Sequence, residues 1–226
     1  MYLAGVVVAM AACGPGVAST ETGAEGSGSA EGSSTGAPSC EQLADASDIG
    51  PRVSVSVRHE GTTPVFFRPH GCGGAITIAI RENGADVPWL IDGDCTPSTC
   101  QGFVDQGDCS VGCNDCAPPQ AGRIDAGAMG DATWPGSIST ELAFDDACAP
   151  AADCPMTCLR RDQAAPGLYE VALTVYRTCT GTCECDGPGS GVCGLWSGDE
   201  QLSDEVTVTA ALDYPMQTSI ELVITD

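Results

Sequence analysis

Cysteine is the residue type with the widest chemistry in this chain, because thiols can bind metals, carry redox reactions, accept a lipid or form disulfides. The chain has fifteen cysteines among 226 residues, and Cys13 stands apart near the N-terminus. The remaining fourteen are an even number, which is typical of disulfide-bonded proteins in an oxidising compartment. We expect seven disulfides, with the pairing left open, among Cys40, Cys72, Cys95, Cys100, Cys109, Cys113, Cys116, Cys148, Cys154, Cys158, Cys179, Cys183, Cys185 and Cys193.

Metal binding is the more specific alternative to disulfides for these thiols. Cys113 and Cys116 have the two-residue spacing of half a zinc knuckle, and with Cys109 they match part of an iron–sulfur spacing. The chain has no second Cys-x-x-Cys pair, and an oxidising compartment maintains thiolate ligands poorly. No βαβ pattern flanks the pair, as a thioredoxin-like redox site would require. We therefore predict no metal on the thiolates.

Histidine and carboxylate side chains are the other candidate ligands. Two histidines, His59 and His70, are too few for a zinc or copper site, so we expect turn or surface positions for them. Calcium is the one cofactor left open, because oxygen ligands gather in three acidic clusters: Asp92 with Asp94, Asp105 with Asp108, and Asp145 with Asp146. These clusters lack the spacing of an EF-hand loop, and Asp is equally typical of turns.

Catalytic motifs are absent from the sequence. It contains no Gly-x-Ser-x-Gly elbow, no His-Glu-x-x-His pair and no phosphate-binding Gly-rich loop with its Lys. We predict a protein that is not an enzyme and has no catalytic residues. A secreted enzyme whose acidic site forms only in three dimensions is left as an alternative.

An apolar run from Tyr2 to Ala12 precedes Cys13. At roughly a dozen residues it is too short to cross a bilayer, which needs ~20, but it suits the core of a signal peptide. The tetrapeptide Met10-Ala11-Ala12-Cys13 resembles the lipobox of bacterial lipoproteins, with Met where Leu is usual. The resemblance implies a signal peptide over 1–12, a lipid on Cys13, and attachment through it to the bacterial cell envelope, at the outer membrane or cell surface.

The segment that follows, residues 14–39, consists almost entirely of Gly, Ser, Ala, Thr and Glu. It cannot bury enough apolar surface to offset its chain entropy, so we predict that residues 13–39 form a lipidated, disordered tether. A flexible chain of this length has an r.m.s. reach of about 25–30 Å. Such a tether would hold a folded domain, residues 40–226, away from a membrane surface.

The charge of the chain limits its partners. The formal net charge is −23, all eight basic residues are Arg, and there is no Lys. So negative a surface repels nucleic acid, which we exclude as a partner, and it leaves a protein partner open.

Alternating apolar and polar residues are the main structural signal, and they predict strands. We found no convincing amphipathic helix; only residues 39–45 could begin a short one. The dipeptide Asn83-Gly84 predicts a hairpin turn. The expected strands span 53–58, 64–68, 75–81, 86–90, 137–144, 168–176, 205–210 and 219–225.

Antiparallel strands with one apolar face must be covered by a second sheet or close into a barrel. We predict an all-β, immunoglobulin-like antiparallel β-sandwich with long disulfide-rich loops, and a β-barrel as the alternative. The early strands at 53–67 and 76–89 and the late Pro166-Gly167-Leu168-Tyr169 resemble the intracellular proteinase inhibitor domain of bacilli. That resemblance implies a sandwich and, as an alternative function, protease inhibition by a disulfide-braced loop.

The functional hypothesis is a non-enzymatic, lipid-anchored envelope protein that displays a β-sandwich for binding or for a structural role. It rests on the lipobox anchor, the tether and the lack of a catalytic constellation in the sequence.

Overall fold

The structure is a computed structural model, and the residues it describes are 40–46, 49–70, 74–91, 99–106, 119–143, 148, 157–185 and 191–226. Residues from Gly36 to Asp226 form one compact unit. Its elements, in chain order, are η1 (Cys40–Leu43), β1 (Val53–His59), β2 (Val65–Phe67), β3 (Ala79–Glu82), β4 (Ala85–Asp86), α1 (Cys100–Gln106), β5 (Ala121–Ile124), β6 (Met129–Trp134), β7 (Ser137–Ala143), β8 (Thr157–Gln163), β9 (Gly167–Thr180), β10 (Val192–Leu195), β11 (Gln201–Tyr214) and β12 (Ser219–Ile224).

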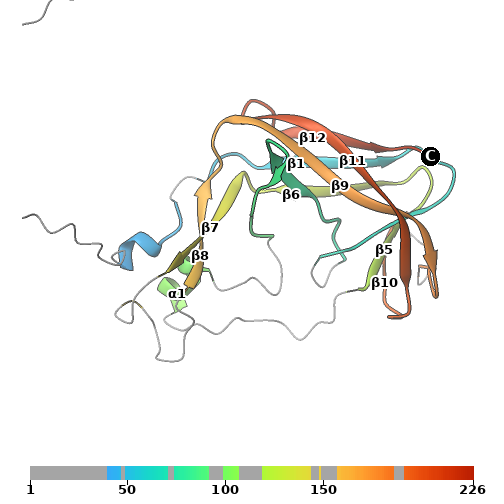
Figure 1. Cartoon of the computed structure of the whole chain (residues 1–226), viewed down its shortest axis with the longest axis horizontal. Coiled ribbons are helices and arrows are strands. Elements are labelled where there is room, and N and C mark those ends of the chain that lie inside the picture. Colours follow the sequence, from blue (N-terminus) through green and yellow to red (C-terminus); the bar gives the residue numbers. More distant parts are fainter. Residues whose placement is uncertain are drawn as a thin grey trace, which may run out of the picture. The chain divides into compact units, whose positions relative to one another are not determined.

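The strands form three open sheets. One has the order β12-β1-β6, and the large one has the order β10-β5-β2-β9-β3-β4, with β11 also paired to β9. A two-stranded sheet joins β7 and β8. Figure 1 shows the long β9–β11 pair as the two longest arrows of the fold. The predicted all-β sandwich is confirmed, and the barrel alternative is wrong because the sheets do not close.

The core follows from the alternation of apolar residues in the sequence. Val53, Val55 and Val57 of β1 are buried, and they share one cluster with Leu173 and Val175 of β9. Fully burying one such side chain contributes about 1.5–3 kcal/mol, so the period-two pattern fixes which face of each strand points inward.

Three aromatic rings close the core beside the turn that follows β6. The Trp134 ring centroid lies 5.3 Å from that of Tyr169 and 4.9 Å from that of Tyr214. Each ring also has a polar partner: Trp134 Nε1 donates to Ser137 O at 3.0 Å, and Tyr214 Oη donates to Gly136 O at 3.1 Å. Buried aromatic residues with satisfied polar atoms stabilise a core without a desolvation penalty.

One edge of β9 carries two strands end to end. Phe66 of β2 pairs with Tyr176, and Ala79 of β3 pairs with Ala172. The two residues on β9 are four positions apart, whereas their partners are thirteen positions apart. The chain between β2 and β3 therefore has nine more residues than a continuous strand would need, so it cannot pair with β9 along its whole length. We call residues 68–78 the β2–β3 connection.

Eight of the fourteen body cysteines are paired in four disulfides: Cys40–Cys148, Cys100–Cys158, Cys179–Cys183 and Cys185–Cys193. Cys13 and the other six, Cys72, Cys95, Cys109, Cys113, Cys116 and Cys154, lie outside the described residues. From the sequence we expected the paired cysteines in loops, but five of them lie in regular elements: Cys40 in η1, Cys100 in α1, Cys158 in β8, Cys179 in β9 and Cys193 in β10.

Three sequence predictions need correction. The final strand, β12, pairs with β1 in parallel rather than antiparallel orientation. A short helix, α1, forms where none was predicted; the Thr99 hydroxyl caps it by accepting from Gly102 N at 2.9 Å, and Phe103 anchors it in a small core. Strands β5, β6, β8 and β10 were missed, because they are short, carry Gly or lack clean alternation.

Gly136 offers a direct test of this packing. Its φ is +75°, and a Cβ there would lie 2.3 Å from Pro51 O and 2.6 Å from Tyr214 Oη. We predict that Gly136→Ala lowers the free energy of unfolding by about 3 kcal/mol, because the left-handed conformation and the clash add. Gly84→Ala is the matched control: its φ is +80° but a Cβ meets nothing within 4 Å, so only about 1 kcal/mol is expected. Equal losses in urea denaturation would contradict this packing.

Candidate functional site

Two hollows flank the end of the β2–β3 connection, and they are the candidate site. The face hollow, about 310 Å³, is lined by Arg68, Thr77, Ile78, Ala79, Ala172, Thr174, Tyr176 and Glu205. The edge hollow, about 290 Å³, is lined by Arg52, Ala75, Ile76, Thr77, Trp89, Ile91, Asp131, Ala132, Thr133 and Pro135. Thr77 lines both. Volumes near 300 Å³ are at the lower end of the range for small-ligand pockets.

The position of Thr77 follows from strand alternation. Ile76, Ile78 and Ile80 are buried in the main core, so the residues between them point to the outer side. Thr77 and Ala79 therefore line the same outer surface as Ala172, which pairs with Ala79.

The Thr77 hydroxyl lacks a partner among the described residues. Its Oγ1 is buried and makes no hydrogen bond there, although the residue as a whole is only partly buried. A buried polar atom without a partner costs about 1–3 kcal/mol. Native structures contain few such atoms, and one that lines two hollows indicates a position where a ligand or a water would bind.

Arg68 and Tyr176 form the polar end of the face hollow. The guanidinium carbon of Arg68 lies 5.6 Å from the Tyr176 ring centroid, in a cation–π arrangement. This contact positions the guanidinium over the ring, and the guanidinium forms no ion pair with a described carboxylate. Tyr176 is itself positioned by pairing with Phe66 on one side and Glu205 on the other.

The backbone of Thr174 faces the interruption of the sheet, which is the stretch of the β9 edge between its pairing with β2 at Tyr176 and its pairing with β3 at Ala172. Val87 N donates to Ile80 O at 2.8 Å, so the peptide groups of Ile80 point toward β4. Peptide groups alternate along a strand, so those of Ala79 point toward Ala172 on β9, and those of Thr174 point to the same edge. No backbone hydrogen bond joins Thr174 to a described residue of the β2–β3 connection.

The edge hollow lies along β6, which is the outer strand of its sheet. Asp131 and Thr133 face outward from β6, and Arg52 precedes β1. Trp89 contributes a partly buried ring. The edge hollow therefore combines an aromatic surface with both signs of charge, as the face hollow does.

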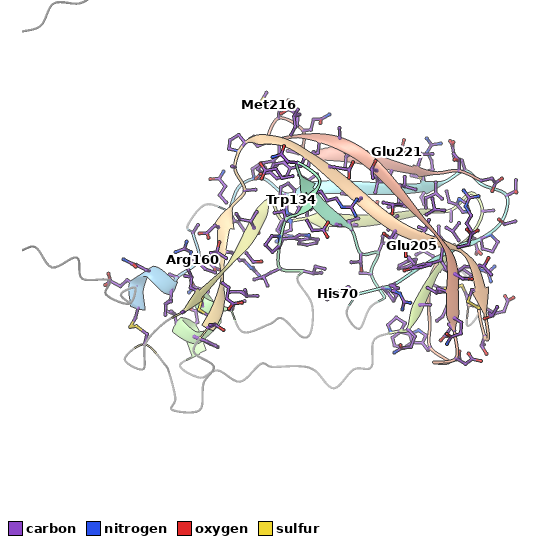
Figure 2. All side chains as sticks on the ribbon, viewed as in Figure 1. His70, Trp134, Arg160, Glu205, Met216 and Glu221 are labelled. Atoms are coloured by element: carbon purple, nitrogen blue, oxygen red, sulfur yellow. A yellow bond between two sulfur atoms is a disulfide. The ribbon has the colours of Figure 1, made fainter. Side chains whose placement is uncertain are left out.

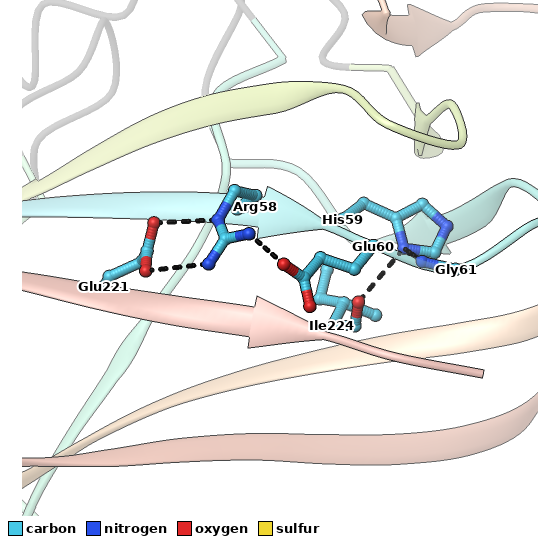
Figure 3. A network of polar contacts seen from close by, with 6 residues as sticks. All are labelled: Arg58, His59, Glu60, Gly61, Glu221 and Ile224. Atoms are coloured by element: carbon cyan, nitrogen blue, oxygen red, sulfur yellow. Dashed lines mark hydrogen bonds and ion pairs between the residues drawn. The ribbon is translucent and has the colours of Figure 1, made fainter.

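A polar network at the ends of β1 and β12 has a structural role (Figure 3). Arg58 donates to Glu221 through Nε at 3.0 Å and Nη2 at 3.2 Å, and it also contacts Glu60. These groups lie on the surface, and they cross-link the parallel β1–β12 pair.

His59 is a buried structural residue. Its Nδ1 lies 3.2 Å from Gly61 N, which can only donate, and 3.4 Å from Ile224 O, which can only accept. The shorter contact favours a lone pair on Nδ1, so that the proton on Nε2 donates to Thr63 O at 2.6 Å. The sequence analysis expected a turn or surface position, and the burial of His59 corrects that expectation.

The other residues that the sequence singled out do not line the hollows. His70 is exposed and forms a bridge with Ala75 at the start of the connection, where Figure 2 labels it. Asp105 accepts from Gln101 within α1. The remaining carboxylates considered for calcium, Asp92, Asp94, Asp108, Asp145 and Asp146, lie outside the described residues.

Two features are absent from the described part of the chain. No group of three or more His, Cys, Asp or Glu side chains is arranged to hold a metal ion there. Nor does that part contain a helix long and apolar enough to cross a membrane.

Sequence reasoning missed every residue of the face hollow. Arg68 follows a short apolar strand, and Thr77, Thr174 and Glu205 occupy the polar positions of alternating strands. Such residues are indistinguishable from an ordinary solvated face until the register brings them together. The one local indication in the sequence was the position of Arg68, which stands between the apolar run Val65–Phe67 and Pro69-His70-Gly71, where the strand pattern ends.

Comparison with known proteins gives no relative: no family model, no curated protein and no solved structure matches the chain.

The Arg58–Glu221 pair generates a pH prediction. The hydrogen bond from Arg58 lowers the pKa of the Glu221 carboxyl below its ordinary value of about 4.3. A carboxyl with a lowered folded-state pKa stabilises above its ordinary pKa, and this contribution is lost as the pH falls through the lowered value. We predict that Glu221→Gln reduces the Tm slightly at pH 7 and leaves it unchanged near pH 2.

Salt provides the check on that prediction. Both partners are exposed, so 1 M NaCl should shrink the difference between wild type and Glu221→Gln at pH 7. A difference in Tm that persists at pH 2 or in high salt would contradict an electrostatic role for this carboxylate.

Proposed function

We propose that the chain is a non-enzymatic binding protein of the bacterial cell envelope, anchored through a lipid on Cys13, and that its β-sandwich binds a small polar ligand in the two hollows around Thr77. The observation that carries the proposal is the buried Thr77 Oγ1, which has no partner among the described residues and lines both hollows. Burying that atom unpaired lowers the stability of the free protein, and a ligand would recover the loss.

The chemistry of the lining supports recognition. A guanidinium, hydroxyl groups, a carboxylate and aromatic rings converge on each hollow or its rim. These groups orient a ligand by hydrogen bonds and stacking.

The frame around the hollows supports binding without large rearrangement. Thr77 lies between two core residues, and the long β9–β11 pair ends in a region braced by Cys179–Cys183 and Cys185–Cys193. Preorganised lining residues reduce the entropy that a ligand must offset.

The anchor is tested by metabolic labelling with radioactive palmitate in a bacterial host. We expect the wild type to be labelled and to sediment with membranes, and Cys13→Ala to be unlabelled. A Cys40→Ala, Cys148→Ala double variant is the matched control: it removes two sulfurs of one disulfide and should keep the label. A Cys13→Ala protein that stays labelled and membrane-bound would defeat the anchor.

The binding site is tested by Thr77→Val, which replaces the hydroxyl by a methyl of similar volume. We predict that the free energy of unfolding rises by about 1 kcal/mol, because the unpaired buried oxygen is removed. Thr99→Val is the contrast: its hydroxyl caps α1, so that variant should lose about 1 kcal/mol.

A ligand screen of the wild type and both variants then tests whether Thr77 takes part in binding. Wild-type protein in a thermal-shift screen of small polar metabolites should give hits that Thr77→Val weakens and Thr99→Val retains. A Thr77→Val protein that is less stable than wild type, or hits that respond equally to both variants, would contradict a ligand-binding role for Thr77.

A further inference from the structure

We propose that the face hollow binds a small zwitterion, a molecule that carries both a carboxylate and an ammonium group, as free amino acids and short peptides do. This inference rests on the proposed function, and it names the chemical class that the face hollow selects. Its basis is a pair of opposite charges that line one hollow without pairing with each other.

Arg68 is the anion-binding end. Among the described residues it makes a cation–π contact with Tyr176 and no ion pair, whereas Arg58, Arg81, Arg123 and Arg160 each form ion pairs. The chain has 31 acidic residues for eight basic ones, so an arginine held away from the described carboxylates is unusual. Its planar guanidinium can bind a carboxylate through two parallel hydrogen bonds.

Glu205 is the cation-binding end. It lies directly opposite Tyr176 on β11, whereas Arg68 follows β2 on the other side of β9. Neighbouring strands are ~4.8 Å apart, so the two backbones are separated by about 10 Å. No ion pair joins Arg68 to Glu205, and the row formed by Tyr176 and Thr174 lies between them.

The floor of the hollow supplies polar groups for the part of the ligand between its charges. Thr77 Oγ1 is buried and unpaired among the described residues, and it can donate or accept. The peptide group of Thr174 points to the interruption of the sheet and offers one donor and one acceptor. These groups match the amide or hydroxyl groups of a small peptide or amino acid.

Charge complementarity separates a zwitterion from simpler ligands. A simple anion would be attracted by Arg68 but repelled by Glu205 and by the net charge of −23, and a simple cation would meet Arg68. A ligand with both charges satisfies both ends. A volume of about 310 Å³ suits an amino acid or a short peptide.

Titration of the full, oxidised, ¹⁵N-labelled chain with four related probes tests the proposal by chemical-shift mapping. L-alanyl-L-alanine carries both charges, N-acetyl-L-alanine only the carboxylate, L-alaninamide only the ammonium, and N-acetyl-L-alaninamide neither. We expect the dipeptide to bind at least about tenfold more tightly than each of the other three, with shifts at Thr77, Thr174 and Tyr176.

Charge-removing variants assign the two ends. Arg68→Gln should weaken the dipeptide and N-acetyl-L-alanine about tenfold and should not weaken L-alaninamide. Glu205→Gln should weaken the dipeptide and L-alaninamide and should not weaken N-acetyl-L-alanine. Arg177→Gln and Glu141→Gln are the matched controls, because each removes an exposed charge that does not line the hollow: Arg177 contacts Thr225 O, and Glu141 lies on β7. Both variants should bind as wild type does.

The outcomes separate this inference from the proposed function. Equal affinity for the dipeptide and N-acetyl-L-alaninamide, or unchanged dipeptide binding in both Arg68→Gln and Glu205→Gln, would overturn zwitterion recognition. If the hollow residues still shift with an uncharged or singly charged probe, the proposed binding function stands. If neither these probes nor any compound of the thermal-shift screen perturbs the hollow residues, both proposals fail.

Discussion

The interruption between β2 and β3 is the constraint on which the candidate site depends. Both strands pair with the same edge of β9, and the nine surplus residues between them must leave the sheet. They cannot be absorbed by a shift of register, because Ile76, Ile78 and Ile80 must face the core at one end and Phe67 is fully buried at the other. This mismatch in length gives rise to the hollows, to the exposed position of Arg68, and to an edge at Thr174 that no described residue of the connection pairs with.

Core packing and sheet pairing therefore oppose each other at this point. Continuous pairing along β9 would satisfy the Thr174 peptide group, but the connection packs two isoleucines, Ile76 and Ile78, into the core instead. Burying each such side chain contributes about 1.5–3 kcal/mol, which exceeds the net gain of about 0.5–1.5 kcal/mol from one hydrogen bond. The fold accepts unpaired polar groups in exchange for apolar burial, and those groups become available to a ligand.

The sequence predicted the parts of the fold that depend on local pattern. Strands β1, β9, β11 and β12 alternate clearly, and Asn83-Gly84 forms the expected hairpin turn, with φ of +52° and +80°. Strands such as β6, which begins with exposed Met129 and Gly130, carry too little apolar periodicity to be recognised. They form because neighbours with stronger patterns offer an edge to pair with.

The candidate site could not be predicted, because its residues meet only through register. Arg68 and Glu205 are distant in sequence, and nothing near either residue indicates that both flank Tyr176. The disulfide pairing was open for the same reason: Cys40 and Cys148 are 108 positions apart. A cysteine count predicts that bridges form, and only the folded chain determines their partners.

The measurement that tests the interrupted strand most directly is amide hydrogen exchange across β9, followed residue by residue by NMR in the free protein. The amides of Leu173 and Val175 point toward β11 and should exchange slowly, whereas the Thr174 amide faces the interruption and should exchange at least about tenfold faster. A Thr174 amide as protected as its two neighbours would show that β9 is paired without a break, and the site described here would not exist.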